Sequence, residues 1–150
     1  MQNFIAAQSP VTHQAVGFTV ADASLAGHNS GDVIKFPSIL YNEGYHFDRD
    51  TGIFTCPVTG MYNFHVALRS HPTRVVAASI PYEHSPWLHI TMASIYADGA
   101  AGMTSSNQAV FKCDQGVKVW VEAIMYSDQL THGHVMAQFN TFSGFLITPM

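Results

Sequence analysis

Apolar and polar residues alternate along several short stretches of the chain, and the period of the alternation is two. The stretch 61–68 is the clearest case. Its even-numbered residues are all apolar and share one face of an extended strand: Tyr62, Phe64, Val66 and Leu68. Apolar residues at the spacing of an α-helix are not sustained anywhere, which argues against long helices. The pattern therefore predicts an all-β domain.

Turn residues separate these stretches at short intervals, as in Asp50-Thr51-Gly52. The predicted strands are 17–20, 33–36, 39–41, 53–56, 61–68, 87–96, 109–113, 117–126 and 142–148. The stretch 92–101 is interpreted as the end of a strand followed by a Gly-rich loop. Short strands between such turns are typical of a sandwich or a jelly roll. The closing stretch is apolar, so we expect it inside a sheet, because a bare apolar edge promotes aggregation.

The composition adds an expectation about assembly. The 150 residues suit a single domain spanning 1–150, in which 1–16 form an N-terminal arm. Only 11% of the residues are charged, whereas 47% are hydrophobic. An average soluble chain is roughly 25% charged. This deficit favours a surface that is partly buried against copies of the same chain.

Charge and hydropathy exclude two classes of partner. The net charge is −4, and the six Lys and Arg residues are scattered, so the chain lacks the basic footprint of a nucleic-acid-binding protein. No apolar run approaches the roughly 18 residues of a membrane span. We therefore expect neither nucleic-acid binding nor membrane insertion. The opening residues have no basic start or continuous apolar run, so no signal peptide is recognised.

The two cysteines, Cys56 and Cys113, each lie in an apolar, strand-like run. A disulfide between them is one alternative in an oxidising compartment. Free cysteines are among the most buried residues, so the sequence favours two reduced thiols in the core.

Several motifs together carry a family resemblance. Tyr41-Asn-Glu-Gly44, Phe47-Asp48, Thr51-Gly52, Phe54-Thr-Cys-Pro57 and Gly60-Met-Tyr-Asn-Phe64 follow one another in the order and spacing of the central signature of the complement C1q globular head family. Residues 109–111, 119–121 and 142–146 are similar to the late strands of that family. The resemblance covers about 17–149, which is nearly the whole chain.

The resemblance implies a ten-stranded jelly-roll sandwich of the tumour necrosis factor-like type, packed as a compact homotrimer. It also implies that Thr51-Gly52 closes a tight hairpin and that Gly144 passes close to aromatic rings. Phe142, Phe145 and Trp120 would then help to bury the surface between subunits. The segment 70–101 is the least similar part. No collagen-like stalk precedes the domain, so the chain looks like the stand-alone invertebrate members, several of which are lectins.

An enzyme or a metal centre is not favoured. Serine occurs without a Gly-x-Ser-x-Gly elbow, and no motif groups an acid, a base and a nucleophile. His132 and His134 have only Asp128 nearby as a further ligand, so surface histidines are favoured over zinc. His65 falls on the face opposite Phe64 and is interpreted as a packed or interface histidine.

We expect no cofactor, with calcium as the alternative that the sequence does not favour. Relatives often bind calcium through aspartates in apical loops. The corresponding divergent segment supplies only Glu83 and Asp98 as carboxylates. One or two carboxylates make a weak calcium site unless several subunits combine them.

The best candidate ligand residues are arginines, histidines, aromatic residues and one aspartate in the predicted loops or at the ends of predicted strands. Arginine pairs with a carboxylate through two hydrogen bonds, and tyrosine or tryptophan stacks on the apolar face of a sugar. The candidates are Arg69, His71, Arg74, Tyr82, His84, Trp87, Tyr126, Asp128 and His132. The alternative for Tyr82 and Trp87 is a role in the core or between subunits.

The resemblance implies a secreted, extracellular protein and, together with these candidate residues, favours a pattern-recognition lectin of innate immunity. We expect a homotrimer that binds acidic glycans, with sialic acid favoured, through its loops. The alternative is a cytokine-like or adhesive trimer that binds a protein receptor along the grooves between subunits.

Overall fold

The computed structural model describes residues 14–23, 31–69, 77–82, 85–93, 104–123 and 140–150. Eleven strands and no helix occur in these ranges. The strands are β1 (Gly17–Ala21), β2 (Ser38–Glu43), β3 (Phe47–Asp48), β4 (Ile53–Thr55), β5 (Gly60–Arg69), β6 (Ala77–Tyr82), β7 (Ser85–Ala93), β8 (Thr104–Cys113), β9 (Lys118–Trp120), β10 (Glu122–Ala123) and β11 (Thr141–Pro149). The all-β expectation is therefore confirmed for the described part of the chain.

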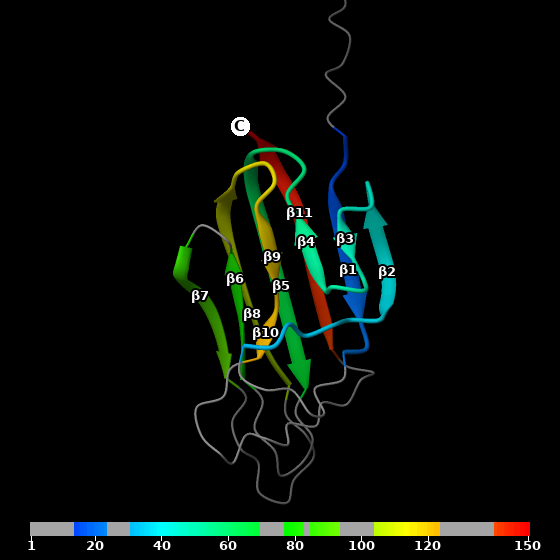
Figure 1. Ribbon diagram of the computed structural model, residues 1–150, viewed down its shortest axis with the longest axis vertical. Helices are drawn as coiled ribbons and strands as arrows, with labels where there is room; N and C mark the ends of the chain where they lie inside the picture. The colour runs from blue at the N-terminus through cyan, green and yellow to red at the C-terminus, as the bar shows by residue number, and fades with distance from the viewer. Residues whose placement is uncertain (1–13, 24–30, 70–76, 83–84, 94–103, 124–139) are drawn as a thin grey trace, which may run out of the picture.

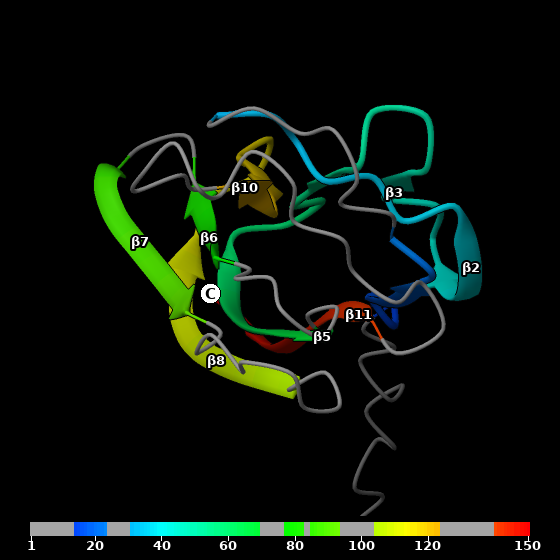
Figure 2. The same cartoon turned by 90° about the horizontal axis from the view of Figure 1, so that it is seen from below.

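Two antiparallel sheets form the sandwich (Figures 1 and 2). The five-stranded sheet has the order β2-β1-β11-β5-β8, and the second sheet has the order β10-β6-β9-β4-β3 with β7 beside β6. The closing strand β11 lies between β1 and β5, as its apolar sequence predicts. β9 and β10 pair with β6 in one continuous register and are interrupted only at Val121.

The predicted strand 33–36 is wrong for all but one residue. Only Val33 pairs with the sheet, through an isolated bridge to Glu122, while Ile34 and Phe36 are fully buried. This segment leads from the second sheet to β2 in the first, so it cannot follow either ladder for long. Its alternation therefore reflects burial of two side chains and not strand pairing.

Phenylalanine rings fill the space between the sheets. Phe18 lies at the centre, with its ring centroid 4.7 Å from that of Phe54 and 4.9 Å from that of Phe142. Phe64 is also fully buried, and its neighbours on β5 alternate as the sequence predicts. Each fully buried aromatic or aliphatic side chain contributes about 1.5–3 kcal/mol of hydrophobic stabilisation.

A short turn joins β3 to β4 at the edge of the second sheet. The Gly52 N–H donates to the Asp48 carbonyl over 2.8 Å, and Gly52 has φ +76°, so the turn favours glycine. This confirms the tight hairpin expected at Thr51-Gly52. The Asp48 carboxylate accepts a hydrogen bond from the Asp50 N–H, which lowers the pKa of Asp48.

The two cysteines are free, fully buried thiols, as the sequence favours. A hydrogen bond from Cys113, followed by desolvation, raises the pKa of Cys56 far above its ordinary value. Tyr62 lies beside them and donates to the Val58 carbonyl over 2.7 Å, while burial raises the pKa of Tyr62 to about 12. The thiolate is the reactive form of cysteine, so the raised pKa protects Cys56, and burial shields Cys113 from reagents.

We expect neither cysteine to react with a thiol reagent in the native protein at neutral pH. After denaturation without reductant, the same reagent should find two thiols per chain, from Cys56 and Cys113. Reaction of the native protein as fast as the denatured chain would contradict their protection. Zero thiols after denaturation would instead reveal a disulfide.

Candidate functional site

The solvent side of the five-stranded sheet carries large apolar side chains. On β5 the even-numbered residues from Tyr62 to Leu68 face the core, so the odd-numbered residues face outward. The same alternation on β11 and β8 exposes Phe145 by 52% and Val110 by 50%. Both lie in one cross-strand row with Asn63 between them.

A second row crosses the same face. Tyr41, which is 50% exposed, is followed across the sheet by Thr19, Ser143, His65 and Gln108. We call these two rows, with Ile147 at 50% exposure on β11, the apolar face. The charged residues of this sheet lie towards its margins: Glu43 on the edge strand β2, Lys112 on the edge strand β8 and Arg69 at the end of β5. Large exposed apolar side chains that gather on one face of a sheet indicate an interaction site.

Two of the three residues expected between subunits, Phe142 and Trp120, do not lie on the apolar face. Phe142 is fully buried in the core, because it lies three positions before Phe145 on β11 and an odd spacing puts the two side chains on opposite faces. Trp120 belongs to the second sheet, where it pairs with Ile53. Only Phe145 lies on the apolar face. The residues that sequence analysis missed are Val110 and Tyr41. Apolar residues on both faces of a strand, as in Val110-Phe111, are the signal that could have identified them.

Most of the predicted ligand residues lie outside the described residues: His71, Arg74, His84, Tyr126, Asp128 and His132. Arg69, Tyr82 and Trp87 lie in strands whose backbone is described. The strand ends nevertheless show where each connection leaves the sandwich.

The connections that contain Arg74 and Asp128 leave the same end of the sandwich. β5 ends at Arg69 and β6 begins at Ala77. Ala123, the last residue of β10, pairs with Ala78, so the chain leaves β10 beside the start of β6. Asn140 precedes β11 at this end, is 1% exposed, and donates to the Ala23 carbonyl over 2.9 Å. We call this end, where β5 and β10 finish, the loop end (Figure 1).

Tyr82 does not lie at the loop end. It is the last residue of β6, pairs with Ser85 at the start of β7, and so belongs to the opposite end of the sandwich. Six residues of β6 span about 17–20 Å at the usual rise per residue. β6 therefore places the backbone of Tyr82 and the start of β7 at the opposite end of the sandwich from its own first residue, Ala77.

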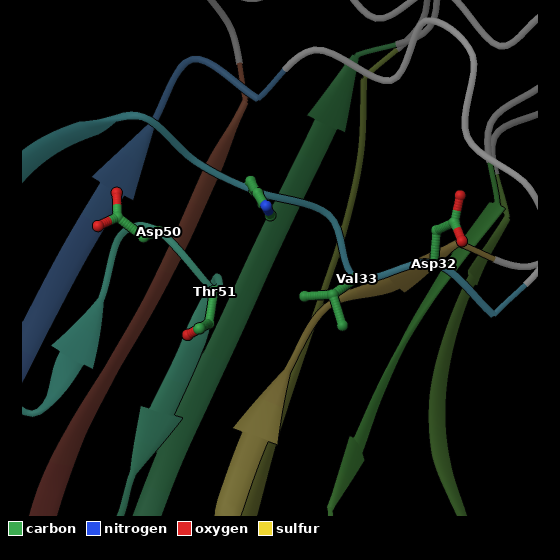
Figure 3. Close-up of a pocket in the computed structure, with 5 residues that line it drawn as sticks. Asp32, Val33, Asp50 and Thr51 are labelled. Carbon is green, nitrogen blue, oxygen red and sulfur yellow. The ribbon is translucent and has the colours of Figure 1, made fainter.

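A shallow hollow of about 580 Å³ lies on another part of the surface (Figure 3). It is lined by Asp32, Val33, Lys35, Asp50 and Thr51. Figure 3 shows Asp32 and Asp50 at opposite sides of the hollow, so their carboxylates do not converge on a common point. This geometry does not form a cation site.

Within the described ranges, no group of three or more His, Cys, Asp or Glu residues could hold a metal ion. Glu83 and Asp98, the carboxylates considered for calcium, lie outside those ranges. The described part of the chain also contains no helix long and apolar enough to cross a membrane.

Comparison with known proteins connects this geometry to a family. The C1q domain family matches residues 17–147. Mouse complement C1q tumor necrosis factor-related protein 3 is 36% identical over 127 residues, which cover 83% of this chain and 49% of that protein. Zebrafish caprin-2 is 34% identical over 145 residues, covering 92% of this chain and 15% of the relative. The chain thus spans half or less of the length of these relatives.

Solved structures agree with this assignment. The globular domain of zebrafish complement 1qA protein superposes with a TM-score of 0.75 at 21% identity, covering 91% of this chain and 99% of that domain. Murine APRIL superposes with a TM-score of 0.64 at 12% identity, covering 89% and 99%. These likenesses confirm the jelly-roll sandwich of the tumour necrosis factor-like type. The family match extends over most of the chain, and the chain belongs to the C1q domain family.

Proposed function

We propose that this chain works as a homotrimeric recognition module that binds a ligand and catalyses no reaction. C1q domains are non-enzymatic recognition domains that are typically soluble trimers. The observation that carries the proposal for this chain is the apolar face, on which Phe145 and Val110 are 52% and 50% exposed. In the trimer, neighbouring copies would cover this face and remove its apolar side chains from water.

The chemistry of the face supports self-association over contact with a charged partner. Its central rows contain aromatic, aliphatic and neutral polar residues, and its charges lie towards the margins. Depletion of charge at the centre and polar residues at the rim are typical of protein interfaces. A chain with 11% charged residues also has few charges to present to another class of macromolecule.

We further propose that the trimer is an extracellular lectin for acidic glycans, with sialic acid favoured, and that the ligand binds at the loop end. Arg69 and Arg74 are two of the three arginines in the chain, and both belong to the stretch from the end of β5 to the start of β6. A guanidinium pairs with the carboxylate of an acidic sugar through two hydrogen bonds. Three such sites in one trimer would gain affinity by avidity.

The strand arrangement also suggests which other candidates could assist. The connection between β10 and β11 contains Tyr126, Asp128 and His132. β10 ends and β11 begins at the loop end. A tyrosine ring can stack on a sugar, and a carboxylate can accept hydrogen bonds from its hydroxyls. We therefore favour these three as the partners of the two arginines over Tyr82, His84 and Trp87.

The substitutions Arg69→Ala and Arg74→Ala should each weaken binding of a sialylated glycan by about tenfold or more, because a charge-assisted pair is worth roughly 1.5–3 kcal/mol. Lysine at either position should restore only part of the loss, because an ammonium cannot form the forked contact. Surface plasmon resonance on an immobilised sialyl-lactose, with lactose as the reference, measures both effects.

Arg49→Ala is the matched control, since it removes the same charge from the exposed turn between β3 and β4. It should leave glycan binding unchanged. If Arg69→Ala and Arg74→Ala also bind like the parent, the ligand site is elsewhere. If the parent binds no glycan on a broad array, the lectin proposal fails.

The second candidate function, binding of a protein receptor by the trimer, has its own support. Leu40 on the edge strand β2 is 67% exposed, and Tyr45 in the following turn is 90% exposed. Tyr45 is held at φ +60° in a turn that Asn42 ties to Phe47 through two hydrogen bonds. Exposed aromatic and aliphatic residues on a rigid edge suit a protein partner.

A further inference from the structure

His65 lies at the centre of the apolar face. It is on β5, between β11 and β8, and it faces outward because Phe64 and Val66 on either side are fully buried. Its cross-strand neighbours are Ser143 on β11 and Gln108 on β8. The side chain is partly exposed in the single chain.

No opposite charge faces His65 from the elements beside it. Its neighbours on these strands are all uncharged. They are Ser143, Thr141 and Phe145 on β11, Gln108, Ser106 and Val110 on β8, and Asn63 and Ala67 on β5. Across β1, the same row ends at Tyr41 on β2. The charged residues of the described sheet lie in other rows: Glu43 on β2, Lys112 on β8, and Arg69 at the end of β5. Lys112 pairs with Asp114 over 3.4 Å.

We propose that protonation of His65 weakens self-association, so that the trimer dissociates in mildly acidic solution. This inference rests on the proposed self-association through the apolar face. Histidine is the side chain that ordinarily gains its charge between about pH 8 and pH 5. In a single subunit water solvates the charged imidazolium, whereas a covering subunit removes that water and the described face supplies no carboxylate beside it.

The sign of the effect follows from linkage between proton binding and assembly. Covering His65 without a counter-charge disfavours its charged form, so the assembled protein binds fewer protons than the separate subunits. Lowering the pH therefore favours the subunits. Each trimer contains three copies of His65, and each copy contributes up to about tenfold in the association constant per pH unit. The neutral imidazole, which both donates and accepts hydrogen bonds, suits a row of Ser143 and Gln108.

Light scattering at about pH 7.5 and about pH 5.5, at constant ionic strength, tests the inference. The parent should have about three times the 16.4 kDa mass of one chain at the higher pH and the mass of one chain at the lower pH. His65→Gln keeps hydrogen bonding without a charge and should stay trimeric at both. His65→Lys carries a permanent charge and should be monomeric at both.

His46→Gln is the matched control, because His46 lies just before β3 and its carbonyl accepts a hydrogen bond from the N–H of Thr55 on β4, in the second sheet. It should dissociate like the parent. The role of His65 is overturned if the parent stays trimeric at the lower pH, or if His65→Gln dissociates there as the parent does. Neither result contradicts the proposed trimer. A parent that is monomeric at the higher pH would overturn the proposed self-association and this inference together. Circular dichroism of each variant separates dissociation from unfolding.

Discussion

Phe145→Asp and Val110→Asp, made one at a time, are each expected to convert the proposed trimer into a monomer. Both side chains are half-exposed on the apolar face, at 52% and 50%, so neither substitution disturbs the core. In the assembly, each new carboxylate would be covered by a neighbouring copy without a partner, at a cost of several kcal/mol per charge. Such a loss weakens association by roughly 100-fold or more. Light scattering at micromolar concentration measures the change.

Val58→Asp is the control for this prediction. Val58 is also an exposed apolar residue, at 38%, but it lies in the turn before β5 and outside the apolar face. Its contact with Tyr62 uses the backbone carbonyl, which the substitution retains. This variant should stay trimeric. If all three variants are trimeric, the subunits meet through another surface. If the parent is monomeric, the proposed self-association is wrong.

The alternation of apolar and polar residues predicts much of the fold, because a strand such as β5 buries one face in the core and turns the other outward. On β5 the even-numbered residues from Tyr62 to Leu68 are at most 1% exposed, so a period of two is visible without any structure. The pattern fails where a segment changes sheets. Ile34 and Phe36 alternate into the core, but their backbone passes from one sheet to the other and pairs only at Val33.

The apolar face could be predicted only in part. A half-exposed apolar side chain on the surface of a subunit has the same chemistry as a buried one. Hydropathy therefore does not separate Phe145 from Phe142. Counting residues along the strand does separate them, since an odd spacing puts two residues on opposite faces. The register that aligns Phe145 with Val110 comes from strands distant in sequence, and it is visible only once the sheet is built.

The grouping of candidate ligand residues shows a different limit. Arg74 and Tyr82 are both candidate ligand residues and are close in sequence. β6 runs from Ala77 to Tyr82 between them, so the connection before this strand and the connection after it attach at opposite ends of the sandwich. Asp128, distant in sequence, belongs to a connection that starts beside Ala78 at the start of β6. In a β-sandwich, candidate residues in loops are better grouped by the end of the sandwich at which each loop attaches than by their distance in sequence.

The substitution Gly144→Ala is expected to destabilise the fold strongly for a change of one methyl group. A Cβ at this position would lie 2.6 Å from Cδ1 of Phe64 and 2.8 Å from Cε1 of Phe18. Both rings are buried, and Phe18 is stacked on Phe54 at 4.7 Å, so neither ring can move away freely. Overpacking of this kind costs about 1–3 kcal/mol. Thermal unfolding followed by circular dichroism should show a Tm lower by about 3–10 °C.

Gly17→Ala is the matched control, because it adds the same methyl group to the neighbouring strand β1. A Cβ at Gly17 would meet its nearest atoms, the Gly144 carbonyl oxygen and Cβ of Phe145, at 3.4 Å, which is ordinary van der Waals contact. Replacing a strand glycine otherwise stabilises by roughly 0.5–1 kcal/mol, because glycine loses more backbone entropy on folding. The Tm of Gly17→Ala should therefore equal or exceed that of the parent. An equal fall in Tm for both variants would show that loss of glycine, and not the contact of β11 with the aromatic core, causes the effect.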